Sequence, residues 1–155
     1  MSRLVVIGAN GNLGHAVVTA FQKSDRFNVI PVTRAELDLT DSAEKITNEL
    51  DELQPDIIIS AAAYTFVDKA EEEPELAYQV NAKAPEYIAS WVQKNNKYWV
   101  HFSTDYVFDG TKKGEYAETD TPNPLSFYGK TKRMSEEFIL REAKRATIFR
   151  ITWLY

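Results

Sequence analysis

The stretch LVVIGANGNLG at residues 4–14 decides which fold this chain can adopt. Its first four residues are apolar without alternation, as expected for a strand that is buried on both faces. Gly8, Gly11 and Gly14 follow at intervals of three, and a helix is expected over about residues 13–23. Glycines at this spacing allow a tight turn and a close approach of the backbone to a pyrophosphate at the helix N-terminus. The stretch therefore predicts a dinucleotide-binding turn, and the alternative is a strand–helix turn that binds nothing.

Strand and helix patterns alternate along the rest of the chain. Further strands are expected at residues 27–32, 57–59, 98–103 and 146–151. Helices are expected from Thr40 or Asp41 to about Leu53, over about residues 74–94 with a kink or break at Pro85, and over about residues 127–142. This alternation predicts an α/β fold, a doubly wound parallel sheet of the Rossmann type with helices on both faces. Residues 1–155 are expected to form one domain.

The composition narrows the possible functions. A net charge of −5 argues against a nucleic-acid partner held by phosphate contacts. The chain has no cysteine that could form a disulfide, act as a nucleophile or bind a metal. The apolar run after Met1 is too short for a signal peptide or a membrane span. We therefore expect a cytoplasmic protein without a metal and without a nucleic-acid or membrane partner.

Ligands of such sheets bind beyond the carboxyl ends of the strands, so the residues at these ends are candidate site residues. Thr33 and Arg34 follow the second strand. An arginine pairs with phosphate through two parallel hydrogen bonds, so it suits the 2′-phosphate of NADPH better than the 2′-hydroxyl of NADH. The alternative is a solvated arginine that pairs with Glu36. We expect NADPH as the preferred cofactor, with NADH as the second choice.

Two further strand ends carry candidate residues. Small side chains at residues 60–63 follow the third strand and would let a flat ligand lie against the backbone. Helix–sheet packing explains the same residues without a ligand. After the fourth strand, Ser103 and Thr104 are placed to hydrogen-bond a carbonyl oxygen, although Ser-Thr-Asp also serves as a plain turn.

Tyr128 and Lys132 are the strongest candidates for chemistry. They are four residues apart at the start of an expected helix, so both side chains leave the same face. An ammonium beside a phenol favours the phenolate and lowers the pKa of the tyrosine, which makes Tyr128 a candidate acid/base group. The pattern alone is a weak signal, because both residue types are common on helices.

Other polar and aromatic residues have structural interpretations. His101 lies within the fourth strand and is interpreted as structural. The acidic run at residues 71–73 is interpreted as a solvated helix start. Trp91 and Trp99 are interpreted as core or partner-facing residues.

Several blocks of sequence give the chain a resemblance to the extended short-chain dehydrogenase/reductase family. Within that family the chain is most similar to the dTDP-4-dehydrorhamnose reductases. The blocks are GANGNLG (8–14), SAAAYTFVDKAEEEPELAYQVN (60–81), HFSTDYVFDG (101–110), PLSFYGKTK (124–132) and RITWLY (150–155). The resemblance implies an enzyme of nucleotide-sugar biosynthesis that uses NADPH or NADH. Its reaction would reduce the 4-keto group of dTDP-4-dehydro-6-deoxy-L-mannose to give dTDP-L-rhamnose.

The resemblance also implies a role for each matching residue. Tyr128 protonates the developing alkoxide, Lys132 holds the nicotinamide ribose and lowers the pKa of Tyr128, and Thr104 hydrogen-bonds the reacting oxygen. Besides Tyr128 and Lys132, the implied cofactor contacts are Gly8, Asn10, Gly11, Asn12, Leu13, Thr33, Arg34, Asp38, Leu39, Ala62, Ala63, Tyr64 and Thr65. The implied contacts to the dTDP-sugar substrate are Thr104, Asp105 and Trp153.

Members of this family are much longer than this chain, and their C-terminal part completes the substrate pocket. We expect the substrate domain to be absent here, so that residues 1–155 are the dinucleotide-binding domain with the catalytic tyrosine and lysine. Such a chain is expected to bind a dinucleotide more readily than it reduces a sugar. Helices in this half often form a dimer interface in the family, so a homodimer is one option.

Two other functions stay open. One is an NDP-sugar epimerase or dehydratase of the same family, which would retain NAD; the HFSTDYVFDG block and Thr33-Arg34 argue against it. The other is a non-catalytic regulatory subunit similar to the β subunit of methionine adenosyltransferase. The complete set of Thr104, Tyr128 and Lys132 favours an enzyme.

Overall fold

The computed structural model describes residues 1–152, and nothing is described for residues 153–155. Its strands form one five-stranded sheet in the order β2-β1-β3-β4-β5. All neighbouring strands are parallel. The strands are β1 (Ser2–Ile7), β2 (Phe27–Val32), β3 (Ile57–Ser60), β4 (Tyr98–Thr104) and β5 (Ala146–Ile151).

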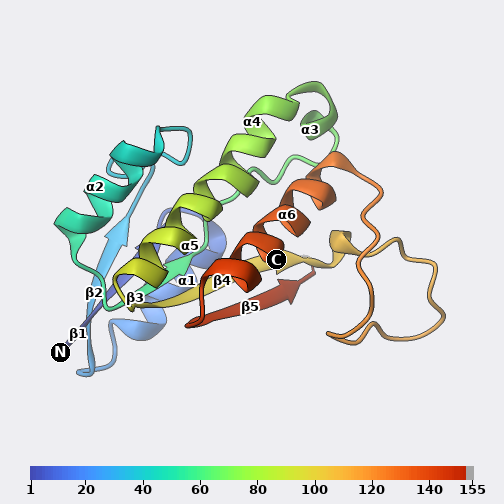
Figure 1. Ribbon diagram of the computed structural model, residues 1–155. Coiled ribbons are helices and arrows are strands. Elements are labelled where there is room, and N and C mark those ends of the chain that lie inside the picture. The colour runs from blue at the N-terminus through green and yellow to red at the C-terminus, as the bar shows by residue number, and fades with distance from the viewer. Residues whose placement is uncertain (153–155) are drawn as a thin grey trace.

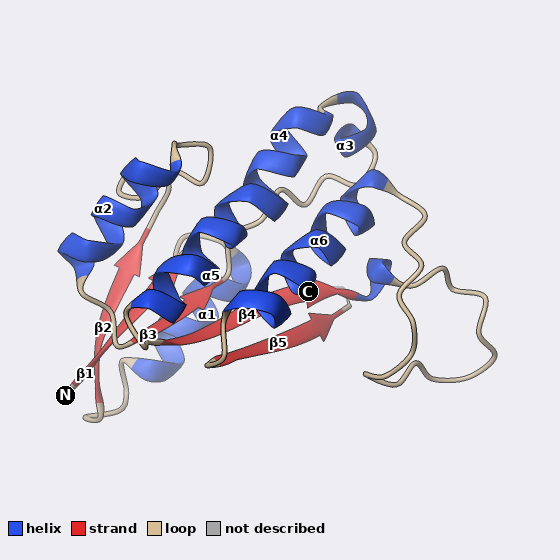
Figure 2. Ribbon diagram, viewed as in Figure 1, coloured by secondary structure: helices blue, strands red, loops and turns tan. Residues whose placement is uncertain are grey.

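Helices cover both faces of this sheet. Figures 1 and 2 show α1 on one face and α2, α5 and α6 on the other. The order of the strands explains the two helix layers. From β1 the chain passes to β2 at one edge of the sheet, whereas β3, β4 and β5 follow one another towards the opposite edge. Because each crossover is right-handed, the connecting helices of the two directions lie on opposite faces of the sheet. The helices are α1 (Asn12–Phe21), α2 (Ala43–Leu53), α3 (Lys69–Glu72), α4 (Pro74–Tyr78), α5 (Ala84–Lys94) and α6 (Phe127–Glu142). The predicted doubly wound fold is confirmed.

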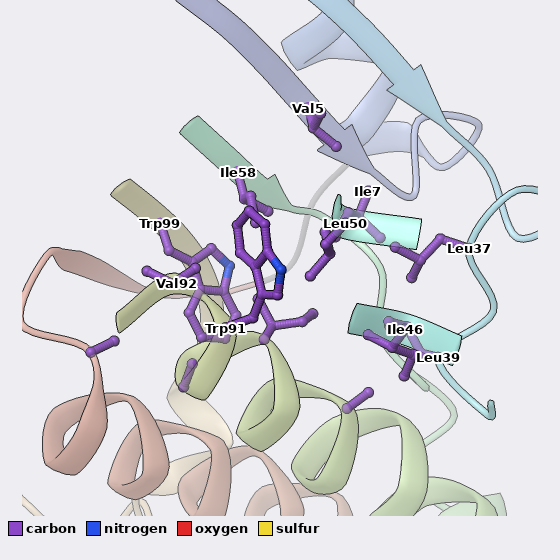
Figure 3. Packing of buried hydrophobic residues seen from close by; sticks show 14 of the residues in the cluster. Val5, Ile7, Leu37, Leu39, Ile46, Leu50, Ile58, Trp91, Val92 and Trp99 are labelled. Carbon is purple, nitrogen blue, oxygen red and sulfur yellow. The ribbon is translucent and has the colours of Figure 1, made fainter. Parts of the chain in front are cut away.

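The larger hydrophobic core lies between the sheet and the layer of α2 and α5 (Figure 3). Trp91 and Trp99 are both buried there, so of the two interpretations, core or partner-facing, the structure supports the core. Each indole N–H has a partner: that of Trp91 donates to Asp51 Oδ1 at 2.8 Å, and that of Trp99 donates to Ser60 Oγ at 2.9 Å. The second tryptophan thus fixes the carboxyl end of β3, where the candidate site begins.

The start of α2 corrects one expectation. Neither Thr40 nor Asp41 caps this helix; the N-cap is Ser42, whose hydroxyl accepts the Lys45 N–H at 3.3 Å. The other two side chains are engaged elsewhere. Thr40 donates its hydroxyl to Asp38 at 2.8 Å, and the Asp41 carboxylate pairs with the Lys45 ammonium at 2.8 Å.

The helical stretch at residues 74–94 is interrupted before Pro85 rather than at it. A π-helical turn, Gln79–Lys83, joins α4 to α5, and the Ala84 N–H reaches back to Gln79 O. Proline has no N–H to donate and its ring crowds the carbonyl four residues earlier, which is that of Asn81. The wide turn relieves this crowding, and such turns are frequent at functional sites.

Candidate active site

A cleft of about 750 Å³ opens at the carboxyl ends of the strands. The structure brings the predicted residues together around it, with one exception within the described part of the chain. Thr33 is not among the cleft residues. Those that line it are Gly8, Asn10, Gly11, Asn12, Leu13, Arg34, Asp38, Leu39, Ala62, Ala63, Tyr64, Thr65, Thr104, Asp105, Tyr128 and Lys132.

The glycine turn is a tightly packed junction between β1 and α1. Gly8 has a φ of +83°, which side chains disfavour, and its N–H donates to Val32 O at 2.9 Å. Gly14 packs directly on the turn, since a Cβ at this position would lie 2.1 Å from Gly8 O. Helix α1 has Gly11 as its N-cap and no acidic residue in its first turn. This end of α1 therefore offers backbone N–H groups and the positive end of a helix dipole, which suit a pyrophosphate.

Arg34 pairs with Asp38, and not with Glu36 as the alternative interpretation supposed. Its Nε donates to Asp38 Oδ2 at 2.8 Å, although the Arg34 side chain as a whole is 75% exposed. Glu36 instead accepts the N–H of Thr33 at 2.7 Å and its hydroxyl at 2.5 Å. This interaction accounts for the place of Thr33 outside the cleft.

Asp38 puts a negative charge beside the arginine at the same end of the cleft. Burial opposes its ionisation, but hydrogen bonds from Arg34 and Thr40 outweigh burial and hold the pKa of Asp38 below its usual value. The site thus presents an ionised carboxylate and a guanidinium together, the groups that bind a ribose hydroxyl and a phosphate, respectively.

Tyr128, Lys132 and Thr104 line the same cleft. Tyr128 and Lys132 lie one turn apart on α6, and Thr104 is the last residue of β4. Lys132 is buried, and its Nζ donates to Phe102 O at 2.6 Å. Burial lowers the pKa of Lys132 to about 8. The geometry gathers a phenol, an amine and a hydroxyl in one pocket, as the sequence predicts.

The pKa of Tyr128 corrects a second expectation. Burial raises it above the ordinary value, and the Thr104 hydroxyl acts in the opposite direction. The expected lowering by Lys132 is wrong for this structure, because the amine is directed to the Phe102 carbonyl and burial of the phenol dominates. Tyr128 consequently keeps its proton at neutral pH.

His101 packs beneath the lysine and confirms its structural interpretation. Its ring is buried, and Nε2 lies 3.1 Å from Ser135 Oγ and 3.5 Å from Lys132 Nζ. Burial, together with the charge of Lys132, lowers the pKa of His101 well below its ordinary value. The imidazole is therefore neutral and places no second positive charge beside the lysine.

Sequence reasoning missed Asn81, which joins two walls of the cleft. This buried residue lies on the π-helical turn. Its Oδ1 accepts the Tyr64 N–H and its Nδ2 donates to Tyr64 O, both at 2.9 Å. Nδ2 also lies 3.3 Å from the Thr131 hydroxyl on α6. A nearby signal in the sequence is Pro85, which indicates an irregularity in this helix but does not identify Asn81.

Three further features concern the substrate, metal ions and the membrane. Trp153, an implied substrate contact, lies outside the described residues. Within residues 1–152 there is no group of three or more His, Asp and Glu side chains arranged to hold a metal ion. In the same part of the chain, no helix has the length and apolar character needed to cross a bilayer.

Comparison with known proteins identifies the relatives of this chain. A family model described as RmlD substrate binding domain matches residues 2–155. A dTDP-4-dehydrorhamnose reductase from Aggregatibacter actinomycetemcomitans is 39% identical over 155 residues, which is 100% of this chain and 52% of the relative. The spore coat polysaccharide biosynthesis protein SpsK from Bacillus subtilis is 35% identical, over 100% of this chain and 54% of its own length. The chain thus spans about half the length of the curated relatives it matches.

Solved structures agree with this grouping. The dTDP-4-dehydrorhamnose reductase of Bacillus anthracis in complex with NADP superposes with a TM-score of 0.93 at 35% identity, over 99% of this chain and 54% of that protein. The UDP-glucose 4-epimerase of Thermus thermophilus in complex with NAD has a TM-score of 0.83 at 21% identity, over 96% of this chain and 54% of that protein. The second similarity shows a shared fold alone.

Proposed function

Because the chain belongs to the family of the RmlD substrate binding domain, we propose that it supplies the dinucleotide-binding and proton-donating part of a dTDP-4-dehydrorhamnose reductase. The reaction would be the NAD(P)H-dependent reduction of the 4-keto group of dTDP-4-dehydro-6-deoxy-L-mannose to dTDP-L-rhamnose. The proposal includes the expected cytoplasmic location, keeps a homodimer as one option, and takes residues 1–155 as the dinucleotide-binding domain.

One observation carries this proposal: the glycine turn and the Tyr128, Lys132 and Thr104 group line a single cleft. The residues present fit a dinucleotide, because the start of α1 combines free helical N–H groups with a lack of acidic residues in its first turn. The glycine turn would hold the pyrophosphate, Arg34 and Asp38 the adenosine ribose, and Ala62, Ala63, Tyr64 and Thr65 the middle of the cofactor. The bound cofactor would supply a hydride to the carbonyl carbon.

The chemistry required of the chain is to stabilise and protonate the oxygen of the ketone. Negative charge develops on that oxygen as the carbonyl is reduced, so donors aimed at it stabilise the transition state more than the ground state. Thr104 would hydrogen-bond the oxygen, and Tyr128 would give it a proton. The raised pKa of Tyr128 suits this direction, because the phenol is still protonated when the reaction begins. Lys132 would hold the nicotinamide ribose, and Asp105 and Trp153 the sugar.

The test is to incubate a full-length protein that carries this chain with NADPH and dTDP-4-dehydrorhamnose. We expect one dTDP-L-rhamnose and one NADP⁺ released per turnover. An interconversion of sugars without net cofactor oxidation would identify an epimerase or dehydratase instead. Stable co-purification with a synthetase, with no sugar reduced, would identify a regulatory subunit.

A further inference from the structure

The first turn of α6, which carries Tyr128, is held by a residue from a distant part of the chain. The first N–H groups of a helix have no partner within the helix. Ser126 accepts one of them, the Gly129 N–H, at 3.1 Å. A second, the Phe127 N–H, donates to Glu71 Oε1 at 2.6 Å. Glu71 belongs to α3, which lies beside the start of α6 (Figure 1).

The same turn also packs closely against Tyr106. A Cβ on Gly129 would lie 2.3 Å from Tyr106 O, so the helix backbone is in direct contact with that carbonyl. The ring of Tyr106 also meets that of Tyr128 edge to face, with centroids 5.7 Å apart. The turn is thus in contact with both Glu71 and Tyr106.

The segment that carries Glu71 is itself anchored, although the Glu71 side chain is exposed. Ala70, the neighbouring residue on α3, is fully buried. Tyr64, at the start of the segment, is held through both backbone polar groups by Asn81, and its phenol donates to Glu73. The acidic run at residues 71–73 is therefore more than a solvated helix start.

We propose that Glu71 is a positioning residue for Tyr128. It acts by accepting the Phe127 N–H and thereby setting the orientation of the first turn of α6. Tyr128 follows this N–H directly, and its hydroxyl lies at the far end of a long side chain, so a small tilt of the turn displaces the proton donor. Lys132 is one turn further along and is held by Phe102 O, so the tilt does not displace it. Loss of Glu71 should therefore impair proton donation by Tyr128 and leave dinucleotide binding nearly unchanged. This effect on turnover rests on the proposed reductase function.

The test compares Glu71→Ala, Glu71→Gln and Glu75→Ala in a full-length protein that carries this chain. Glutamine keeps an oxygen that accepts the N–H, whereas alanine does not. Glu75 is an exposed carboxylate on the next helix whose side chain makes no hydrogen bond or ion pair to residues 1–152, so it controls for the loss of one charge. The measurements are amide hydrogen exchange at residues 127–130, dissociation constants for NADPH, and kcat and KM.

We expect Glu71→Ala to speed exchange at the start of α6 and to lower kcat about tenfold, the scale set by small misplacements of a reacting group. Its dissociation constant for NADPH stays within about twofold, and Glu71→Gln recovers most of the kcat. The proposal would be overturned if Glu71→Ala had the same amide exchange rates at residues 127–130 and the same kcat as Glu75→Ala. An equal loss of kcat and NADPH affinity, which indicates general unfolding, would also overturn it.

The two proposals fail in different ways. A wild-type protein that reduces no 4-keto sugar contradicts the reductase function. The exchange rates of the same variants still decide whether Glu71 holds the first turn of α6.

Discussion

At the scale of single residues, Lys132 combines a functional position with an energetic cost. Its pKa falls from 10.5 to about 8, a shift of roughly 3 kcal/mol at about 1.4 kcal/mol per unit. The unfolded chain keeps this proton up to pH about 10.5, whereas the folded chain keeps it only up to about 8. Between these values the unfolded state binds more protons, so this lysine makes stability rise with pH; below about 8 it imposes a constant penalty.

Replacing Lys132 by methionine tests this cost. The difference in unfolding free energy, wild type minus Lys132→Met, should rise by up to about 3 kcal/mol between pH 8 and 10.5. The variant should also lose affinity for the dinucleotide. Denaturant unfolding at several pH values measures the first effect, with Lys130→Met as an exposed control on the same helix. If the difference in unfolding free energy between wild type and Lys132→Met does not change with pH, the lowered pKa of the buried Lys132 is contradicted.

Arg34 tests cofactor choice at the same scale. If its guanidinium binds a 2′-phosphate, Arg34→Ala should lower kcat/KM for NADPH about tenfold or more and leave kcat/KM for NADH nearly unchanged. Asp38 remains available to bind the ribose hydroxyl of NADH, so the use of NADH should be retained. Steady-state kinetics with both cofactors provide the measurement. An unchanged ratio would show that the ion pair with Asp38 is the whole role of Arg34.

At the scale of elements, two substitutions in the glycine turn should have different effects: one should lower the stability of the fold, and the other should weaken the binding of NADPH. Gly14→Ala places a Cβ 2.1 Å from Gly8 O and should destabilise the fold by about 1–3 kcal/mol, although alanine is the better helix former. Gly11→Ala meets nothing closer than 3.5 Å and has a φ of −77°, so it should fold normally. Its Cβ enters the pyrophosphate region of the cleft and should weaken NADPH binding.

Thermal unfolding and NADPH titration of both variants check this contrast. Equal stability of the two variants would contradict the packing of α1 on the turn. Wild-type NADPH affinity in Gly11→Ala would contradict the assignment of the turn to the pyrophosphate.

The elements also show how much can be read from the sequence. Apolar runs such as residues 4–7 predict the buried strands because burial on both faces leaves no polar alternation. The π-helical turn is not predictable in this way, since it depends on how Pro85 and its neighbours relieve a clash. Helix α3 is only four residues long, too short for a periodic signal.

The residues of the candidate site also differ in how far the sequence predicts them. Motif spacing predicts Tyr128, Lys132 and the glycine turn, because these positions depend on local geometry. The contacts of Glu71 with Phe127 and of Asn81 with Thr131 span 56 and 50 residues, and only the folded chain brings them together. The pKa of Tyr128 also depends on the folded chain, because burial of the phenol raises it. The sequence predicts that Lys132 lies near Tyr128, but not whether the charge of Lys132 or burial dominates the pKa.

At the scale of the whole molecule, the chain matches about half of each longer relative. We expect residues 1–155 alone to bind NADPH, because the proposed dinucleotide contacts lie within them. Turnover of a dTDP-sugar should be lower than in a full-length protein by a factor of about a hundred or more, since substrate positioning and water exclusion are incomplete. Calorimetry and a coupled NADPH oxidation assay on both proteins make the comparison. Equal turnover would show that these residues contain the complete sugar site.

The most direct test of the account is the turnover of Tyr128→Phe in a full-length protein that carries this chain. The variant should retain the wild-type dissociation constant for NADPH and lose at least about a hundredfold in kcat for the 4-keto sugar, as expected when a general acid is removed. Tyr98→Phe, which alters a phenol bonded to Thr147 away from the cleft, should stay close to wild type. Near-normal turnover in Tyr128→Phe would contradict the claim that this phenol donates the proton.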